Sequence, residues 1–300
     1  MSKYLRAHPS VCFSSPKETN YFVSGQPKDS PASVREKFLK TFFAPVDDAA
    51  RIYGEGSVST LYSREALERV LACFPQAKFI VMLRNPVDQL RSYHGRLLYL
   101  RQETEADFEA AWDLQGARSA GQNIPRSCFD ARMLQYGEVG SLGRYTAQLF
   151  DVVGRERCLP ILYDDFSSDT AGAYRRALEF LGLPDCGRTS FNRKNRQRQF
   201  KSTLIQNIYS GAVLGPIGRR LAKHPRHLAK LLRVTRRFRN SLMRSNAVET
   251  RLPPLDSRMV ARLQAHFADD IRALSELLQR DLSHWLAAPN AGEDRLLAQN

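Results

Sequence analysis

The sequence predicts an α/β protein with a mostly parallel central sheet. Two short segments, Phe79–Leu83 and Cys158–Tyr163, contain no charged residue, and segments with the apolar spacing of helices alternate with them. An uninterrupted apolar strand is covered on both faces, which is typical of a parallel sheet flanked by helices. With 300 residues, of which 43% are hydrophobic, the chain is long enough to build one large core.

Residues 61–86, in the first half of the chain, have the pattern of a helix, a strand and the start of a second helix. Leu61–Cys73 has the spacing of an amphipathic helix, and Phe79–Leu83 follows it as a buried strand. The second helix should begin at Pro86, because Asn85 is a favoured N-cap residue and proline suits the first helical position, which needs no N–H donor.

The second half repeats this pattern. Cys158–Tyr163 is the next predicted strand, and Ala171–Leu181 is the helix after it. That helix should end at Gly182, because glycine is common just beyond a helix and Pro184 cannot continue one.

Arg84 lies at the junction between the strand Phe79–Leu83 and the helix that begins at Pro86. The unpaired N–H groups at the start of that helix face the same space as the guanidinium group, and Ser92 offers a hydroxyl group two turns later. These groups suit a phosphate. The alternative is that Arg84 pairs with the carboxylate of Asp88 and that Ser92 is an ordinary helical serine.

The segment Arg84-Asn85-Pro86-x-Asp88-x-x-x-Ser92-Tyr93 resembles the 3′-phosphate-binding segment of the sulfotransferase family. These enzymes use 3′-phosphoadenosine 5′-phosphosulfate (PAPS) as the donor. Six further segments resemble the family in its own order: His8-Pro9, Ser15-Pro16-Lys17-Glu18-x-x-Tyr21-Phe22, Gly54-Glu55-Gly56-Ser57, Tyr163-Asp164-Asp165-Phe166, Phe180-Leu181-Gly182-Leu183 and Arg280-Asp281-Leu282-Ser283-x-Trp285.

The resemblance implies a three-layer fold similar to that of the P-loop nucleotide-binding proteins. It implies one sulfotransferase domain over residues 1–300, with a basic helical insertion at about residues 203–250. It also implies that Arg84 and Ser92 bind the 3′-phosphate of PAPS. A looser match places Arg196 and Arg198 in a basic donor-binding loop, where they would contact phosphate.

The resemblance further implies how the acceptor is activated. Sulfuryl transfer needs an acceptor in line with the leaving oxygen, positive charge near the leaving phosphate and removal of the acceptor proton, and it demands no metal ion. Glu18 aligns with the general base of the glycosaminoglycan sulfotransferases. Lys17 would tune Glu18 or contact the acceptor, although a plain surface ion pair is an equal alternative. Glu55 would position the substrate.

The family binds the donor's 5′-phosphosulfate in a loop that reads roughly P-K-x-G-T-T. Neither this loop nor the strand before it is found in the 300 residues, and no other Gly-rich phosphate loop replaces it. We therefore expect the chain to be N-terminally truncated, either through a start codon assigned too far downstream or as a fragment. The alternative is a catalytically inactive relative that binds nucleotide or glycan.

Three departures from the family pattern bear on the acceptor. Gly56 stands where glycosaminoglycan sulfotransferases usually carry a lysine, Val58 replaces the expected proline, and Thr60 replaces an aromatic residue. These changes argue against a heparan-like polymer. We expect a hydroxyl or amine acceptor on a saccharide or other small glycan.

The basic residues of the chain are concentrated in one segment. Residues 188–251 contain 17 Lys/Arg and one acidic residue, Glu249, whereas the other 236 residues have a net charge of −2. We expect most of these basic residues to lie on a solvated surface, and residues 215–250 could be a lid, a surface for an acidic substrate or a peripheral contact with an anionic membrane. Nucleic-acid binding is the less favoured alternative, because no zinc-finger or helix-turn-helix motif accompanies the charge.

The five cysteines are scattered and form no C-x-x-C pair, which predicts reduced thiols, a cytoplasmic location and no metal site. We expect them to pack as small apolar residues. No stretch approaches 18 apolar residues, so no membrane span is expected. His8 should lie at a helix end, and His94 should pack or lie at the surface rather than act as a catalytic base. Nothing in the pattern predicts an oligomeric state.

Overall fold

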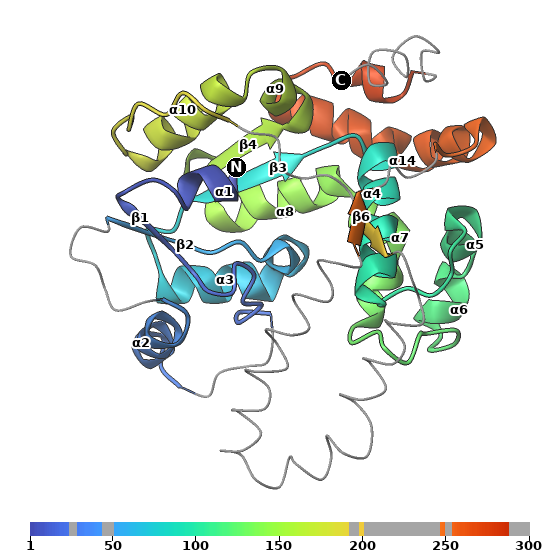
Figure 1. The fold of residues 1–300 in the computed structure, drawn as a ribbon, viewed down its shortest axis with the longest axis horizontal. Coiled ribbons are helices and arrows are strands. Elements are labelled where there is room, and N and C mark those ends of the chain that lie inside the picture. The colour runs from blue at the N-terminus through green and yellow to red at the C-terminus, as the bar shows by residue number, and fades with distance from the viewer. Residues whose placement is uncertain (24–28, 44–50, 192–197, 201–246, 250–253, 288–300) are drawn as a thin grey trace, which may run out of the picture. The chain divides into compact units, whose positions relative to one another are not determined.

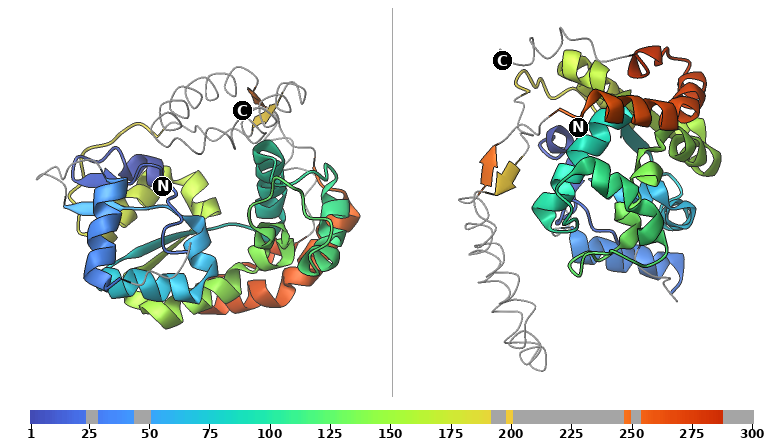
Figure 2. Two further views of the ribbon diagram at one scale, coloured as in Figure 1. Left: turned by 90° about the horizontal axis from the view of Figure 1, so that it is seen from below. Right: turned by 90° about the vertical axis from the view of Figure 1, so that its right-hand side faces the viewer.

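The computed structural model describes residues 1–23, 29–43, 51–191, 198–200, 247–249 and 254–287, with residues 198–200 and 247–249 described by their backbone (Figures 1 and 2). The chain divides into two compact units. The first contains Met1–Leu90, Tyr136–Asn192 and Asp256–Asn300, and the second contains Arg91–Gln135 and Arg193–Leu255.

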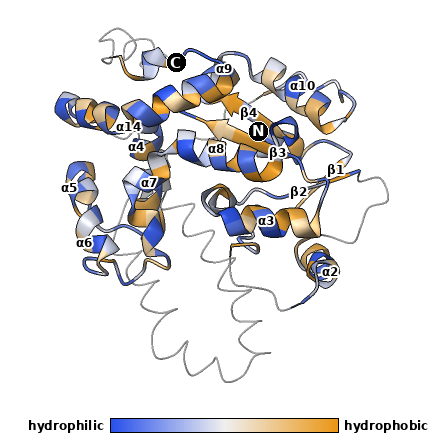
Figure 3. Ribbon diagram, turned by 180° about the vertical axis from the view of Figure 1, so that it is seen from behind, coloured by the Kyte–Doolittle hydropathy of each residue, from blue (hydrophilic) through white to orange (hydrophobic). Residues whose placement is uncertain are grey.

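The strands of the first unit form two parallel pairs, each of two strands. They are β1 (Val11–Phe13) with β2 (Ile52–Gly54), and β3 (Phe79–Leu83) with β4 (Cys158–Leu162). Leu83 is opposite Leu162, so β3 and β4 end at the same level. The predicted parallel pairing is therefore confirmed, and Figure 3 shows both strands as strongly hydrophobic.

The β3 strand is buried more completely on one face than on the other. Leu83 is fully buried and Val81 is nearly so, whereas Met82, which points to the opposite face, is 37% exposed. The expectation that helices cover both faces of this strand is wrong at Met82, because the elements packed around β3 leave that position partly open.

The helices of the first unit surround these strands. They are α1 (Ser2–Leu5), α2 (Pro31–Phe42), α3 (Arg64–Cys73), the first turn of α4 (Pro86–Leu100), α7 (Tyr136–Gly140), α8 (Leu142–Val153), α9 (Tyr163–Ser168), α10 (Thr170–Leu181), α14 (Ser257–Leu278) and the 3-10 turns η1 (Val58–Tyr62), η3 (Arg155–Arg157) and η4 (Ser283–Trp285). Helix α8 packs against β4, α3 and α14, and therefore connects the strands to the C-terminal helix.

Local capping sets where the predicted helices begin. Helix α4 starts at Pro86 as predicted, with the backbone N–H of Val87 donating to Asn85 Oδ1 at 3.0 Å. Helix α3 starts at Arg64 rather than at residue 61, because the Ser63 hydroxyl accepts from Ala66 N at 3.1 Å and the preceding residues form a 3-10 turn.

The second predicted strand and the helix after it each differ from the prediction by one residue at one end. Strand β4 ends at Leu162, because Tyr163 begins α9. Helix α10 begins at Thr170, because the Asp169 carboxylate caps it by accepting from Gly172 N at 2.7 Å. It ends at Leu181 as predicted, and Gly182 has a φ of 71°, which favours glycine.

One apolar cluster joins the two strand pairs. Val11 of β1 and Leu178 of α10 are buried in it together with Leu5 of α1, and Ile80 of β3 packs against them. Burial of each such side chain contributes about 1.5–3 kcal/mol. The cluster therefore fixes the ends of β1 and β3 within one unit.

The second unit contains the rest of α4, then α5 (Phe108–Asp113), α6 (Gln115–Ser119), η2 (Ala131–Leu134) and the antiparallel strands β5 (Arg198–Phe200) and β6 (Ala247–Glu249). A bidentate ion pair lies inside it. Arg118 donates to both carboxylate oxygens of Glu103 at 2.7 Å, and both side chains are essentially unexposed. The Glu103 carboxylate also accepts from two backbone N–H groups, so the buried charge is well compensated.

The cysteine prediction is only partly confirmed. All five thiols are free, Cys73 and Cys158 are buried, and burial raises the pKa of Cys158 to about 11. Cys186 is exposed, because it follows α10 in a surface loop, and the expectation of burial is wrong there. Among the described helices, none is both long and apolar enough to cross a membrane. Most of the predicted basic insertion, residues 203–250, lies outside the described residues.

Candidate active site

Polar side chains follow directly after each of the strands that the structure describes in the first unit. Residues 14–18 follow β1, Glu55 follows β2, Arg84 follows β3 and Tyr163 follows β4. Ligands of open α/β proteins bind at the carboxyl ends of parallel strands. The predicted residues Lys17, Glu18, Glu55 and Arg84 therefore occupy positions where a binding site is expected.

The Arg84 guanidinium group is held between an aromatic ring and a carboxylate. Its Cζ atom lies 4.5 Å from the centroid of the Tyr163 ring, and one terminal nitrogen lies 3.2 Å from Asp88 Oδ2. The alternative pairing with Asp88 is therefore present. It is a single contact between half-exposed side chains and contributes little to stability.

One hydrogen-bond donor of the Arg84 guanidinium group, the buried Nε, has no acceptor among the described residues. A buried donor without an acceptor costs about 1–3 kcal/mol, so such an atom commonly marks a place for a ligand. Arg84 also lies beside the first turn of α4, whose positive end favours an anion.

The predicted base segment is built around an ion pair. Lys17 Nζ lies 2.7 Å from Glu18 Oε1, and the two side chains are 40% and 34% exposed. The Lys17 carbonyl accepts from Gly56 N at 3.0 Å and from the Ser14 hydroxyl at 3.1 Å. A Cβ atom at Gly56 would lie 3.0 Å from Lys17 Cε, so glycine at this position leaves room for the lysine stem.

The Glu55 carboxylate fastens the turn after β2 to the segment after β1. Its Oε1 atom accepts from Thr19 N at 2.8 Å, from the Thr19 hydroxyl at 3.1 Å and from the Ser57 hydroxyl, and its Oε2 atom accepts from Ser57 N at 2.8 Å. Four donors thus engage both oxygens. This arrangement holds the backbone next to Glu18 in place.

Asn20 adds two hydrogen bonds between the segment after β1 and the residues after β2. Its backbone N–H donates to the Ser57 hydroxyl at 2.8 Å, and its side-chain oxygen accepts from the Ser59 hydroxyl at 2.5 Å. The φ of Asn20 is 52°, a left-handed conformation that asparagine tolerates better than most residues. Glu18 therefore lies in a segment whose neighbouring residues Lys17, Thr19 and Asn20 are all hydrogen-bonded to the turn after β2.

The described contacts bring the predicted residues Lys17, Glu18 and Glu55 together as one group. Arg84 lies apart from them in these contacts, against Tyr163. Ser92 lies half-buried on α4, in the second unit. The predicted phosphate contact Arg196 lies outside the described residues. Arg198 begins β5, where the structure describes the backbone.

Tyr163 and the donors to Glu55 were not predicted as site residues. Tyr163 belongs to the Tyr163-Asp164-Asp165-Phe166 match, and a signal for it was available: an aromatic residue at the end of a predicted strand can reach an arginine that follows the neighbouring strand. The Thr19 and Ser57 contacts with Glu55 had no such signal, because hydroxyl residues occur in most turns.

The two histidines singled out in the sequence are both buried. His8 follows α1 and is buried, its Nδ1 accepts from Ser10 N at 3.1 Å, and its Nε2 therefore carries the proton that is donated to the Pro184 carbonyl at 3.0 Å. His94 is buried with Nε2 2.9 Å from the Glu105 carbonyl, and burial lowers its pKa. The residues described contain no group of three or more His, Cys, Asp or Glu arranged to hold a metal ion.

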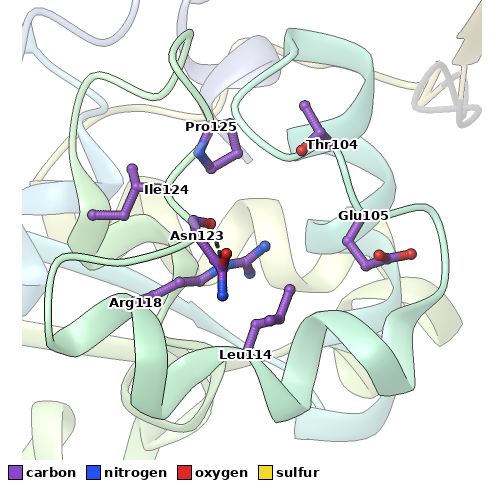
Figure 4. Close-up of a pocket in the computed structure, with 7 residues that line it drawn as sticks. All are labelled: Thr104, Glu105, Leu114, Arg118, Asn123, Ile124 and Pro125. Carbon is purple, nitrogen blue, oxygen red and sulfur yellow. Dashed lines mark hydrogen bonds between the residues drawn. The ribbon is translucent and has the colours of Figure 1, made fainter.

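The second unit has a pocket of about 380 Å³ (Figure 4). The Arg118 guanidinium group that borders it is already paired with Glu103, and none of the predicted site residues lines it. The lining residues are Thr104, Glu105, Leu114, Arg118, Asn123, Ile124 and Pro125.

Solved structures resemble this chain. A sulfotransferase from Alicyclobacillus acidocaldarius is 20% identical, with a TM-score of 0.61 over 95% of this chain and 92% of that one, which indicates the same fold. The sulfotransferase domain from the curacin biosynthetic pathway is 14% identical over 61% of this chain and 69% of that one, with a TM-score of 0.35. No curated protein matches the sequence.

A family model described as the Sulfotransferase family matches residues 13–186, which is more than half of the chain. The matched range begins at the last residue of β1 and contains β2, β3, β4 and the residues Lys17, Glu18, Glu55 and Arg84. Its α/β elements and parallel strand pairs agree with the fold of the Alicyclobacillus enzyme. The chain is therefore a member of the Sulfotransferase family.

Proposed function

We propose that this sulfotransferase transfers a sulfuryl group from PAPS to a hydroxyl or amine group of a small glycan acceptor. In this proposal Arg84, with Ser92, binds the donor's 3′-phosphate, Arg196 and Arg198 are additional phosphate contacts, and Glu18 is the general base. The sulfur–oxygen bond to the donor phosphate breaks as a bond to the acceptor forms, and the acceptor proton passes to Glu18. The donor leaves as 3′-phosphoadenosine 5′-phosphate.

The observation that carries the donor site is the environment of Arg84. Its guanidinium group is oriented by the Tyr163 ring, lies beside the start of α4 and has a buried Nε donor without a partner among the described residues. A phosphate oxygen would accept from this donor, and the helix start would stabilise its charge. Asp88, which makes one weak contact, can be displaced by a dianionic phosphate.

The assignment of Glu18 rests on its place after β1 and on its anchored backbone. The carboxylate is one-third exposed, so an acceptor hydroxyl group can reach it. Lys17 Nζ lies 2.7 Å from one of its oxygens, so the lysine would orient the carboxylate beside the acceptor. Glu55, whose oxygens already accept four hydrogen bonds, supports this arrangement and would position the acceptor through the same segment.

Donor binding can be tested by calorimetry with two nucleotides that differ only in the 3′-phosphate. 3′-Phosphoadenosine 5′-phosphate and adenosine 5′-phosphate would each be titrated into the wild type, Arg84→Ala and Arg272→Ala. Arg272 is an exposed arginine of α14 paired with Asp269, and it serves as a matched control. Loss of a charged hydrogen-bonded contact should weaken binding of the 3′-phosphorylated nucleotide about 10- to 100-fold in Arg84→Ala.

Binding of adenosine 5′-phosphate should stay within about twofold in all three proteins, since it lacks the group that Arg84 contacts. Equal affinity of the wild type and Arg84→Ala for the 3′-phosphorylated nucleotide would contradict the donor site. Nucleotide binding without transfer of labelled sulfate from PAPS to any glycan acceptor would favour an inactive, nucleotide-binding relative.

A further inference from the structure

The segment Arg280–Trp285 contacts Asn85 and Asp164, which directly follow Arg84 and Tyr163 in the chain. Trp285, the last residue of η4, is 1% exposed and belongs to the first unit together with Arg84. Its indole Nε1 donates to Asp164 Oδ2 at 2.9 Å, and Asp164 directly follows Tyr163. The tryptophan therefore restrains the start of α9, where the ring beneath Arg84 is located.

The carbonyl oxygen of Trp285 contacts the residue before α4. It accepts from Asn85 Nδ2 at 3.5 Å and from Gln264 Nε2 of α14 at 3.3 Å. Asn85 directly follows Arg84 and caps α4 with its own side-chain oxygen. The buried Trp285 thus contacts both Asn85, which follows Arg84, and Asp164, which follows Tyr163.

An ion pair between Arg280 and Asp165 also joins this segment to α9. Both terminal nitrogens of Arg280 lie 3.1 Å from the two oxygens of Asp165, in the bidentate geometry that holds a carboxylate in one orientation. His284 Nε2 also lies 3.3 Å from Asp164 Oδ2. Adjacent acidic residues after β4 are therefore both held by the segment before the C-terminus.

We propose that Trp285 is a positioning residue for donor binding, which acts through Asp164 and Asn85 to keep the Tyr163 ring and the Arg84 guanidinium group stacked. The inference rests on the proposed role of Arg84. A guanidinium group held in one rotamer loses less conformational entropy when it binds phosphate, so loosening its supports should weaken recognition of the 3′-phosphate in particular.

The test compares the affinities for 3′-phosphoadenosine 5′-phosphate and adenosine 5′-phosphate. In Trp285→Phe the ring still packs but the indole N–H is lost, and the ratio of the two affinities should fall about five- to tenfold. Trp112→Phe, the same change in the second unit, should leave the ratio unchanged. Asp164→Ala removes the acceptor at an exposed position, so it should fold even if Trp285→Phe does not, and it should lower the ratio similarly.

Rescue and coupling distinguish positioning from general destabilisation. Asp164→Asn retains an oxygen acceptor and should restore the ratio to within about twofold of wild type. In the Arg84→Ala background, Trp285→Phe should have no further effect on the ratio, because the group it positions is gone. Equal weakening of both nucleotides by Trp285→Phe would overturn the inference.

The failures of the two proposals give different results. If Arg84→Ala abolishes the preference for the 3′-phosphate while Trp285→Phe and Asp164→Ala keep it, the positioning role is wrong and the donor site stands. If Arg84→Ala keeps the preference, the donor site itself is wrong, and the role proposed for Trp285 falls with it.

Discussion

At the scale of single residues, Arg84 shows how a charged side chain can be held ready for a ligand. Its guanidinium group stacks on Tyr163, and its buried Nε has no acceptor among the described residues. Aromatic stacking orients the plane of the group without consuming its N–H donors. Those donors therefore stay available for an anion.

Glu18 and Glu55 are neighbours in space with different surroundings. Glu18 has one partner, Lys17, and is partly exposed, whereas the Glu55 carboxylate accepts four hydrogen bonds. A base must take a proton from the substrate, and protonation of a carboxylate that already accepts four hydrogen bonds would weaken those bonds. The difference in environment favours Glu18 as the base.

The first prediction concerns Glu18→Gln. This change keeps the shape of the side chain and removes its basicity, so transfer of labelled sulfate from PAPS should slow by about 10²- to 10⁴-fold. Binding of 3′-phosphoadenosine 5′-phosphate should be unchanged. Glu36→Gln, on the exposed face of α2, is the matched control and should keep full activity. A Glu18→Gln enzyme as fast as wild type would rule out this base.

The second prediction concerns Glu55→Ala. The backbone N–H groups of Thr19 and Ser57 would lose their acceptor, and the free energy of unfolding should fall by about 2 kcal/mol in urea denaturation. Glu55→Gln keeps one acceptor oxygen and should lose about half as much. If Glu55→Ala were as stable as wild type, the four hydrogen bonds would not be holding the segment.

At the scale of secondary-structure elements, local signals in the sequence predicted most of what was found. The apolar segment Phe79–Leu83 forms β3, Pro86 begins α4, and Gly182 follows the last residue of α10. Each depends on a few adjacent residues. The starts of α3 and α10 were missed by one to three residues, because the caps Ser63 and Asp169 compete with the apolar pattern that marked them.

The site was predicted less completely than the elements. Residues that follow strands could be named, because strand ends are visible in the sequence. The stacking of Arg84 on Tyr163 and the bond from Trp285 to Asp164 join segments far apart along the chain, and they depend on the parallel register of β3 with β4. No local pattern specifies such contacts.

The third prediction concerns the end of α10. A Cβ atom at Gly182 would meet no other atom within 4 Å, so its only cost is the left-handed φ of 71°. Gly182→Ala should therefore lower the free energy of unfolding by about 1 kcal/mol. Gly116→Ala, at an equally open site in α6 with no positive φ, should leave stability unchanged or raise it by up to about 1 kcal/mol. Equal effects of the two changes would contradict this explanation.

At the scale of the whole molecule, two units contribute differently. The first unit holds the paired parallel strands and the residues proposed for transfer, and its apolar clusters connect β1, β3 and α10. The second unit is organised by the buried pair of Glu103 with Arg118, and His94 lies near these charges. Its stability should therefore depend on pH.

The fourth prediction concerns that dependence. Burial lowers the folded-state pKa of His94 below its unfolded value of about 6.5, so the unfolded state takes up a proton more readily. The free energy of unfolding should decrease as the pH falls below about 6.5, until the lowered folded pKa is passed. His94→Gln should flatten this decrease between about pH 7 and pH 5 in urea denaturation. A slope as steep as that of the wild type would exclude His94 as its source.

The central claim is that Arg84 binds the 3′-phosphate of the donor, and a crystal structure of the protein with 3′-phosphoadenosine 5′-phosphate tests it most directly. We expect the 3′-phosphate within hydrogen-bond distance of Arg84 Nε, with the guanidinium group still stacked on Tyr163. A nucleotide bound with its 3′-phosphate elsewhere, and Arg84 still paired with Asp88, would contradict the claim.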